Sequence, residues 1–280
     1  MKTDISRPDG AVRLTVSIVL HRGNLEYFRA TLAGLREAVT TAVGEVKLSI
    51  VDQSLDQAHS DAAHEICVRT LAASHIRWEY IELNKNAGYG AGHNVAIHRE
   101  LGRFHLIMNP DVELPPDWLT ASLEVMELQP DVVLYGTRGK NRHGEEEYLA
   151  KRLPTVWVLL LRAFGTSWLK RIFHRRLSHY ELRDLPAEPA IRDVPLLSGC
   201  CLLAQSDVLK RVGGFDESFF LYFEDYDLAM RMREHGRIVR SGALQFIHHG
   251  GQASKKGWRH ILWFAAGGVR FFSRWGWRWV

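Results

Sequence analysis

The first half of the chain alternates short apolar runs, rich in β-branched residues, with longer segments of helical periodicity. The apolar runs predict five buried strands, at residues 14–20, 46–52, 76–83, 104–111 and 132–136. The segments between them predict four helices, at residues 24–40, 58–73, 88–101 and 115–128. Strands and helices that alternate over short connections indicate a mostly parallel sheet with helices on both faces. The expected fold class is therefore α/β and Rossmann-like.

Two of the predicted strands end at an acidic residue, Asp52 in one and Asp111 in the other. In open α/β sheets, ligands bind beyond the carboxyl ends of the strands. These two carboxylates are therefore the first candidates for contact with a ligand. A simpler alternative for Asp111 is that it only caps the turn that follows it.

The composition of the 280-residue chain, with 46% hydrophobic and 24% charged residues, is typical of a folded globular protein. Its cysteines, Cys67, Cys200 and Cys201, match neither a disulfide framework nor a zinc site, so we expect reduced thiols. No secretory signal opens the sequence, and no apolar stretch approaches the ~20 residues of a spanning helix. These features predict a cytoplasmic protein that does not cross a bilayer.

Two stretches, residues 151–180 and 255–280, contain Lys, Arg and Trp but no Asp or Glu. Basic residues mixed with aromatic ones suit an anionic membrane surface, and no nucleic-acid-binding motif accompanies them. We therefore expect peripheral binding to the inner face of the plasma membrane and no nucleic-acid partner. The alternative is that four large apolar residues of 151–180 pack in the core or in a homodimer contact. Those residues are Trp157, Leu160, Phe164 and Trp168.

The segment NKNAGYGAGHN, residues 84–94, places small residues at the start of a predicted helix. Gly88 and its small neighbours let the backbone approach a ligand closely, and a helix N-terminus favours phosphate oxygens. The spacing matches neither the G-x-G-x-x-G nor the Walker pattern, so a plain Gly-rich turn is the simpler alternative.

Two later segments contribute acids and histidines. In FDESFFLYFEDYDLAMR, Asp225 lies at the start of a predicted helix, whose dipole would keep the carboxylate ionised, as a general base requires. In FIHHGGQAS, His248 and His249 could ligate the same divalent ion as Asp111. Mg²⁺ and Mn²⁺ take oxygen ligands and bridge diphosphates. Taken singly, these segments also fit structural roles, as a helix cap and as packing histidines.

In this order, the segments together resemble the family 2 glycosyltransferases, specifically the rhamnosyltransferase-like branch of bacterial polysaccharide assembly. The matching segments are VSIVL, IVDQS, NKNAGYGAGHN, MNPDVEL, LLSGCCLLAQSDVLKRVGGFDESFFLYFEDYDLAMR and HHGGQAS. They span residues 14–254, and the block from Ser198 to Arg231 is the most specific. The resemblance implies a GT-A fold and an inverting, metal-dependent sugar transfer.

The resemblance also implies roles for individual residues. Asp225 would be the catalytic base, with Glu224 beside it. Mg²⁺ or Mn²⁺ would be bound by Asp111 and by His248 or His249. Asp52 would contact the nucleotide base. The other residues implied at the donor or acceptor site are Asn84, Gly88, Asn94, Asn109, Gly199 and Asp216.

The chain departs from the family pattern at two points. The metal-binding element reads Asn109-Pro110-Asp111, so its first acid is absent, and water, diphosphate oxygens and a histidine would have to complete the shell. The first predicted strand ends in Leu20-His21-Arg22 instead of the more usual Thr/Tyr-Asn, which leaves the base contacts at that edge open.

The predicted organisation is a flexible N-terminus at 1–10, a GT-A domain at 11–254 and an aromatic, basic helical segment at 255–280. Residues 11–140 would bind the nucleotide sugar, and residues 141–254, including the basic amphipathic segment 151–180, would bind the acceptor. The expected reaction moves a sugar, first choice L-rhamnose from dTDP-L-rhamnose and otherwise a UDP-linked sugar, to a glycan or polyprenyl-diphosphate-linked acceptor. The alternatives are a non-catalytic GT-A module that binds a sugar nucleotide or glycan, and a nucleotidyltransferase.

Overall fold

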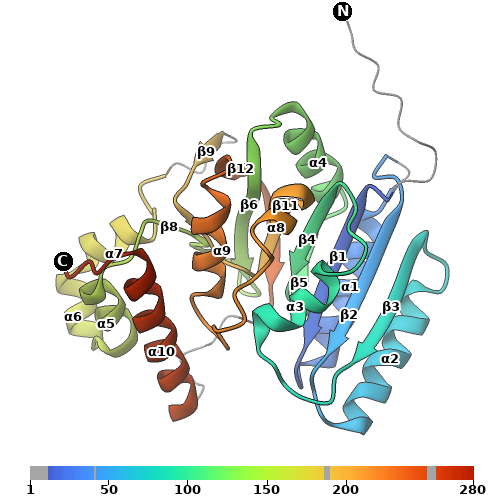
Figure 1. Ribbon diagram of the computed structural model, residues 1–280, viewed down its shortest axis with the longest axis horizontal. Coiled ribbons are helices and arrows are strands. Elements are labelled where there is room, and N and C mark those ends of the chain that lie inside the picture. Colours follow the sequence, from blue (N-terminus) through green and yellow to red (C-terminus); the bar gives the residue numbers. More distant parts are fainter. Residues whose placement is uncertain (1–11, 41, 186–189, 251–256) are drawn as a thin grey trace, which may run out of the picture.

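The computed structural model describes residues 12–40, 42–185, 190–250 and 257–280, so the predicted flexible N-terminus lies outside the described residues. The central sheet has the strand order β3-β2-β1-β4-β11-β6-β12-β5. Helices lie on both of its faces, and a group of helices lies at one end of the molecule (Figure 1). This arrangement is the predicted α/β class with a mostly parallel sheet.

The first four long strands are parallel to one another. They are β1 (Leu14–Leu20), β2 (Val46–Asp52), β3 (Ile76–Glu82) and β4 (Phe104–Met108). The strand predicted at 104–111 was too long, because β4 ends at Met108 and residues 109–111 form a turn. Pro110 has no N–H to donate to a strand ladder, which explains the early end.

The second half of the sheet is built around β11 (Cys201–Gln205), which runs antiparallel to both β4 and β6 (Val132–Asn141). Since β4 and β6 are each antiparallel to β11, they run in the same direction. The strand β6 and its parallel neighbour β12 (Arg237–His248) are therefore parallel to the first four strands. Short strands complete the edges: β5 (Val112–Glu113), β7 (Glu146–Glu147) and β9 (Ile191–Asp193). A separate pair joins β8 (Ala150–Lys151) to β10 (Leu196–Leu197).

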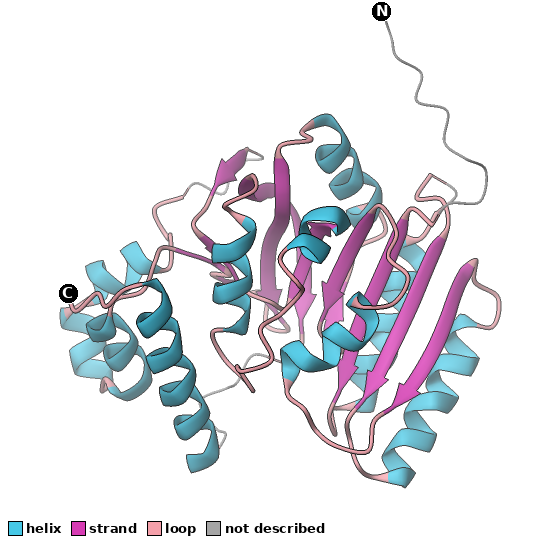
Figure 2. Cartoon of the chain, viewed as in Figure 1, coloured by secondary structure: helices cyan, strands magenta, loops and turns pink. Residues whose placement is uncertain are grey.

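Two hydrophobic clusters fill the two sides of the sheet. One cluster includes α1 (Leu25–Ala38), α2 (Gln57–Leu71) and α4 (Trp118–Leu128). The other includes α3 (Tyr89–Ile97), α8 (Ser206–Arg211) and α9 (Glu224–Met232), which lie on the near face of the sheet (Figure 2). The carboxyl ends of the parallel strands therefore open between two helical layers.

The basic segment 151–180 forms three short helices. They are α5 (Val156–Phe164), α6 (Ser167–Ile172) and α7 (His174–Tyr180). Thr155 and Thr166 cap the starts of α5 and α6, since each side chain accepts a backbone N–H of its helix, and this divides the segment.

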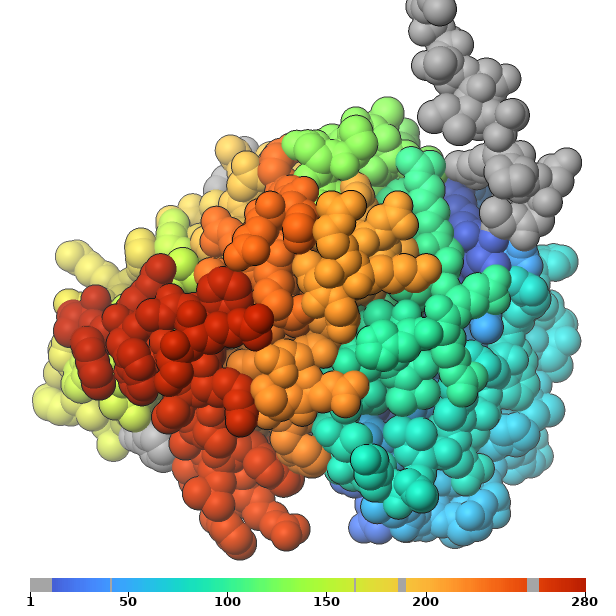
Figure 3. All heavy atoms as spheres, in the orientation of Figure 1, coloured from blue at the N-terminus to red at the C-terminus, as the bar shows by residue number. Residues whose placement is uncertain are grey.

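The C-terminal helix α10 (Trp258–Trp275) packs beside the segment that leads into α9. On the molecular surface, the atoms of α10 lie next to those of this segment (Figure 3). The chain then returns to α5, where the N–H groups of Val156 and Trp157 donate to the carbonyls of Arg278 and Trp279 at 2.7 and 3.2 Å. Among the described helices, none has the length and apolar character needed to span a membrane.

Candidate active site

Residues 198–200, between β10 and β11, join the two groups of residues that the sequence singled out. The N–H of Gly199 donates to Asp225 Oδ2 at 2.9 Å, and the carbonyl of Cys200 accepts the N–H of Asn109 at 2.8 Å. Burial first, and then the charges of Glu147, Asp111 and Asp225, raise the pKa of the Cys200 thiol. Asp111 and Asp225 therefore lie on either side of the same short segment.

Asp111 and His248 form the first half of the site. His248 Nε2 lies 3.3 Å from Asp111 Oδ1, and His248 Nδ1 lies 2.7 Å from Glu147 Oε2. Burial alone would lower the pKa of His248, but the two flanking carboxylates outweigh it and raise the pKa to about 10. The imidazole is thus oriented by Glu147 and presents its second nitrogen to Asp111.

Three observations around this pair fit a divalent cation. Asn109 Oδ1 is buried without a hydrogen-bond partner, and Asp111 Oδ1 is buried with only the His248 ion pair at 3.3 Å beside it. A carboxylate that orients a ligating histidine from its far nitrogen, as Glu147 does here, is the common outer shell of a metal site. A side chain at Gly250 would collide with Asp111, since a Cβ there would lie 1.9 Å from Asp111 Oδ2. Among the described residues no group of three His, Cys, Asp or Glu surrounds one point, so an ion here would need ligands from outside the protein.

His249 points away from this pair. Its Nε2 lies 2.9 Å from Glu113 Oε2, and its ring stacks on Tyr27 with centroids 4.8 Å apart. The backbone N–H of His249 donates to the carbonyl of Asp111 at 2.8 Å. Of the two histidines, His248 is therefore the one placed to share a cation with Asp111.

Asp225 is the second half of the site. Helix α9 begins at Glu224, directly after Tyr222 and Phe223, whose φ angles are 72° and 68°. Non-glycine residues rarely adopt this left-handed conformation, and such strain concentrates at functional sites. Burial raises the pKa of Asp225 to about 6, against the hydrogen bonds from the N–H groups of Gly199 and Tyr226.

Glu224 differs from its neighbour Asp225 in both burial and charge. Its side chain is buried, and Oε2 has no hydrogen-bond partner. Burial, and then the charge of Asp225, raise its pKa well above the usual range. At neutral pH the pair therefore carries its charge on Asp225, while Glu224 stays protonated.

The predicted glycines lie at close approaches of the backbone around Asp225. Gly88 has a φ of 99°, and a Cβ there would lie 2.3 Å from the carbonyl oxygen of Phe220. A Cβ on Gly199 would lie 3.1 Å from that of Asp225. The hydroxyl of Tyr89 donates to the Gly199 carbonyl at 2.6 Å and so fixes this turn.

Asp52, Asn94 and Asn84 have different surroundings, and their contact with a donor stays a prediction. The buried carboxylate of Asp52 accepts hydrogen bonds from the N–H of Ser54 and the hydroxyls of Ser60 and Tyr80, at 2.8, 2.5 and 2.7 Å. The buried amide of Asn94 bonds the backbone of Phe215 in both directions at 2.9 Å, and so positions the chain around Asp216. Asn84 is exposed in the loop after β3.

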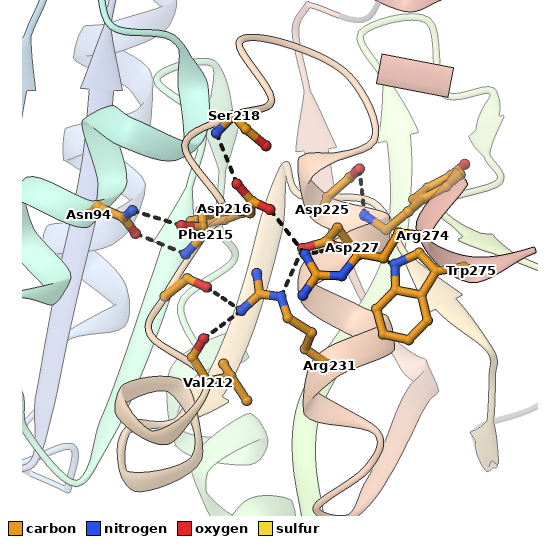
Figure 4. Close-up of polar contacts among 12 residues, drawn as sticks. Asn94, Val212, Phe215, Asp216, Ser218, Asp225, Asp227, Arg231, Arg274 and Trp275 are labelled. Atoms are coloured by element: carbon orange, nitrogen blue, oxygen red, sulfur yellow. Dashed lines mark hydrogen bonds and ion pairs between the residues drawn. The ribbon is translucent and has the colours of Figure 1, made fainter. Parts of the chain in front are cut away.

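Asp216 contacts the C-terminal helix. Its carboxylate accepts from Arg274 at 3.0 Å and from the N–H of Ser218 at 2.9 Å (Figure 4). Burial would raise the pKa of Asp216, but the Ser218 hydrogen bonds and the Arg274 charge outweigh it and lower the pKa. In this structure Asp216 therefore helps to dock α10.

A pocket opens beside Asp111 at the carboxyl end of β1. It lies between this strand, the start of α1 and the turn at Pro110. Its lining residues are Leu20, Gly23, Asn24, Leu25, Tyr27, Phe28, His59, Pro110 and Asp111. The position is the one at which an open α/β sheet binds its ligand.

Two residues of the site were missed in the sequence. Glu147 lies in a stretch that reads only as polar and turn-rich, and its partner His248 is 101 residues away. Tyr89 lies inside the segment NKNAGYGAGHN, which was interpreted only through its small residues. Its aromatic ring among small residues was the available signal.

The chain resembles known proteins in both sequence and fold. The family model for glycosyl transferase family 2 matches residues 18–190. The N-acetylglucosaminyl-diphospho-decaprenol L-rhamnosyltransferase of Mycobacterium tuberculosis strain H37Rv is 29% identical over 177 residues, 59% of this chain and 56% of that protein. The rhamnosyltransferase WbbL of Escherichia coli K12 is 26% identical over 225 residues, 71% of this chain and 79% of that protein.

Among solved structures, GalNAc-T7 with UDP, GalNAc and Mn²⁺ has a TM-score of 0.67 at 12% identity and covers 96% of this chain and 49% of its own. The chain thus spans little more than half of the mycobacterial relative and about half of GalNAc-T7. The structural likeness confirms the predicted GT-A fold, and the curated relatives agree with the rhamnosyltransferase-like resemblance. Because the family model matches more than half of its residues, the chain belongs to glycosyl transferase family 2.

Proposed function

We propose that the protein is an inverting, metal-dependent glycosyltransferase that uses a sugar nucleotide. The observation that carries the proposal is the pairing of Asp111 and His248 on one side of residues 198–200 with Asp225 on the other. A donor diphosphate would lie on the first side, and an acceptor hydroxyl would approach the second.

Asp111 and His248 would bind Mg²⁺ or Mn²⁺, with Glu147 holding the imidazole in place and Asn109 nearby. The unpartnered oxygen of Asn109 and the buried pair of Asp111 with His248 support this assignment. A hard cation takes six or more ligands, so diphosphate oxygens and water would supply the rest. When bound, the ion would stabilise the charge that develops on the leaving nucleoside diphosphate.

Asp225 would accept the proton of the acceptor hydroxyl as the oxygen attacks the anomeric carbon. With a pKa of about 6, its carboxylate is ionised at neutral pH and still basic enough for this role. The protonated Glu224 beside it would keep a second negative charge away from the incoming sugar. A single displacement without a covalent intermediate would invert the anomeric centre.

The first choice of donor remains dTDP-L-rhamnose, since both curated relatives compared above are rhamnosyltransferases. The donor would enter the pocket beside Asp111, and UDP-linked sugars are the second candidates. The mycobacterial relative is named for an acceptor with a diphospho-decaprenol group. We propose an acceptor of the same kind here, a sugar linked through diphosphate to a polyprenol.

Such an acceptor places the protein at a membrane, and the end of the molecule around α5, α6 and α10 suits that position. Large apolar side chains are exposed on these helices and on the C-terminal tail. They are Trp157, Leu160, Trp168, Ile172, Trp258, Ile261, Leu262, Val269, Trp277 and Trp279. Arginines and lysines accompany them without acids, as on an anionic membrane surface. We propose peripheral binding to the inner leaflet, with a homodimer contact as the alternative use of this surface.

The proposed function is tested by a donor screen that measures nucleoside diphosphate release with Mg²⁺, with Mn²⁺ and with EDTA. We expect release from dTDP-L-rhamnose with a divalent ion and none in EDTA. Asp225→Asn should fold normally and lose about 10²–10⁴-fold in turnover. Wild-type turnover in that variant would refute the assigned base. Binding of a sugar nucleotide with no release under any condition would instead favour the non-catalytic module, and release of inorganic pyrophosphate a nucleotidyltransferase.

The membrane proposal has its own test, flotation of the protein with vesicles of phosphatidylglycerol and phosphatidylcholine. We expect flotation with the anionic vesicles and its loss in Trp168→Ser/Ile172→Ser, two exposed positions on α6. A protein that stays at the bottom of the gradient and sediments as a dimer would show that this surface is a contact between copies.

A further inference from the structure

We infer that Lys151, Arg162 and Arg183, grouped around Glu181, form the subsite that binds the diphosphate of the acceptor. We call these four residues the cationic cluster. The inference deepens the proposed function and rests on it, because it names the part of the acceptor that this side of the site would bind.

The cationic cluster has more positive charge than its single carboxylate can balance. Arg183 Nη2 lies 2.5 Å from Glu181 Oε2, while Lys151 Nζ and Arg162 Nε lie 3.8 and 3.9 Å from Oε1. Two arginines and a buried lysine thus share one acid. The neighbouring pair Arg152 and Asp184 has no such excess, since one guanidinium bonds one carboxylate at 2.8 and 2.6 Å and the charges cancel.

The cationic cluster adjoins Asp225 from the side of α5 and α7. Tyr180, the residue before Glu181, hydrogen-bonds Tyr226 through their hydroxyls at 2.7 Å, and Tyr226 directly follows Asp225. The charge of Arg162 reaches Asp225 and lowers its pKa, although burial dominates there. Lys151 pairs with Leu196 across β8 and β10, two residues before Ser198. Asp111 and His248 approach the same segment from β4 and β12, so the two sides of the site have separate cationic and metal-binding elements.

The two arginines are open to a ligand, and the lysine lies behind them. The side chains of Arg162 and Arg183 are 48% and 46% exposed, whereas those of Lys151 and Glu181 are 5% and 12% exposed. Planar guanidinium groups bind phosphate oxygens through pairs of charge-assisted hydrogen bonds. This arrangement suits a compact dianion such as a diphosphate.

The position of Arg162 connects the cationic cluster to the proposed membrane surface. It lies on α5, whose Trp157 and Leu160 are exposed. A polyprenyl diphosphate has its phosphates at the level of the lipid headgroups, where exposed aromatic and aliphatic residues would sit. The sugar beyond that diphosphate would then extend towards Asp225, so that the sugar hydroxyl would reach this carboxylate.

Isothermal titration of inorganic pyrophosphate into the full chain, in EDTA, tests the inference without any transfer reaction. EDTA removes the ion on which donor-side diphosphate binding depends. We expect wild type to bind, and Arg162→Met/Arg183→Met to bind about 100-fold more weakly, since a charge-assisted hydrogen bond is worth about tenfold for each arginine. Arg162→Lys/Arg183→Lys should fall between the two. Arg175→Met, an exposed arginine of α7 outside the cationic cluster, is the matched control and should bind as wild type does.

Two outcomes would overturn the inference: wild type that does not bind pyrophosphate in EDTA, or a double Met variant that binds as tightly as wild type. A second measurement separates the acceptor from ordinary lipid headgroups. If the double variant loses flotation with phosphatidylglycerol vesicles but keeps its pyrophosphate affinity, the arginines bind headgroups and the subsite is refuted.

Transfer kinetics distinguish failure of the subsite from failure of the proposed function. With a prenyl-diphosphate-linked N-acetylglucosamine, the double Met variant should raise the acceptor KM at least tenfold and leave the donor KM unchanged. With an alkyl glycoside of the same sugar, it should leave both unchanged. If wild type transfers to neither acceptor while pyrophosphate binding still requires the arginines, the proposed reaction is wrong and the anion site stands.

Discussion

The proposed donor half of the domain, residues 12–140, contains a chain of buried polar side chains that bond one another, whereas the proposed acceptor half has buried acids and a buried amine near Asp225. A chain of hydrogen bonds crosses the donor half. His105 bonds the hydroxyls of Thr15 and Ser17, each at 2.8 Å, and Ser17 bonds His93 at 2.7 Å. Burial lowers the pKa of both histidines, that of His105 to about 3, so the chain is neutral.

The acceptor half shows the opposite pattern around Asp225. Glu224 is buried with an unpartnered oxygen, Asp225 has a pKa of about 6, and Lys151 is a buried amine beside two arginines. Groups with strongly shifted pKa values cluster at functional sites. The interactions that shift these pKa values destabilise the fold, and proteins retain them where function requires them. The buried polar chain of the donor half is therefore neutral, whereas the buried groups around Asp225 have strongly shifted pKa values.

The largest expected effect concerns Asp227, the one fully buried acid of α9 that does have partners. Its carboxylate accepts from Arg231, Trp275 and Arg274 at 2.8, 3.0 and 3.2 Å, and so ties α10 to the active-site helix. Asp227→Ala leaves the nearly buried Arg231 without its carboxylate and should cost about 3–5 kcal/mol in urea unfolding. Asp216→Ala, which removes a more exposed partner of Arg274, should cost under about 1 kcal/mol. Equal losses would show that α10 is not held by this buried acid.

The next effect probes the donor half through Asp52. Burial opposes ionisation there, but hydrogen bonds from Ser54, Ser60 and Tyr80 outweigh it and lower the pKa. Asp52→Ala should destabilise the protein by about 1–3 kcal/mol at neutral pH, because the donors lose their acceptor. Asp117→Asn, at an exposed acid before α4, should change stability by less than about 0.5 kcal/mol.

The pH dependence of this Asp52 contribution has a definite sign. Because the folded pKa lies below the unfolded value, the stabilisation is complete above pH ~4 and is lost as the pH falls through the folded pKa. Chemical unfolding of wild type and Asp52→Ala between pH 2 and pH 7 should therefore converge in acid. A difference that stays constant over this range would contradict the ionised, hydrogen-bonded carboxylate.

The third prediction sharpens the contrast at Asp225. A base with a pKa of about 6 is protonated in acid, so kcat/KM should fall about tenfold for each pH unit below that value. Glu224→Gln should keep the profile, since Glu224 is already neutral. A profile that is flat down to pH 5 would remove Asp225 as the titrating base, whereas a shift in the Gln variant would show that Glu224 carries charge.

Much of the donor half could be predicted from sequence because its signals are local. The runs LTVSIVL and VKLSIVD are bounded by polar residues, and β1 and β2 have the predicted ends. The predicted strand at 104–111 was wrong only where Pro110 and Asp111 turn the chain. Helix starts were recoverable as well, since Asn24 caps α1 with its own side chain.

The acceptor half depends on pairings between distant residues, which a single sequence does not reveal. The run CLLAQ is apolar like any buried strand, and nothing local places β11 antiparallel between β4 and β6. The partner of His248 is Glu147, and the start of α5 pairs with the backbone of Arg278. For the site, the residue types were recognisable, but the cationic cluster and the order of its members around Glu181 required the fold.

The smallest expected effect is at Lys151, where the unmatched charge itself can be removed. Burial, and then the charge of Arg162, lower its pKa to about 7, although Glu181 and Glu147 act in the opposite direction and Arg183 in the same one. Between this value and the unfolded value of ~10.4, the unfolded chain binds more protons, so stability rises with pH. Lys151→Met, which keeps the bulk of the side chain without the amine, should remove that contribution. The stability advantage of the Met variant should therefore shrink between pH 7 and pH 9 by at most about 1.4 kcal/mol per pH unit, as measured by urea unfolding. A gap that stays constant between pH 7 and pH 9 would mean that Glu181 keeps the lysine charged in the folded protein as it is in the unfolded chain.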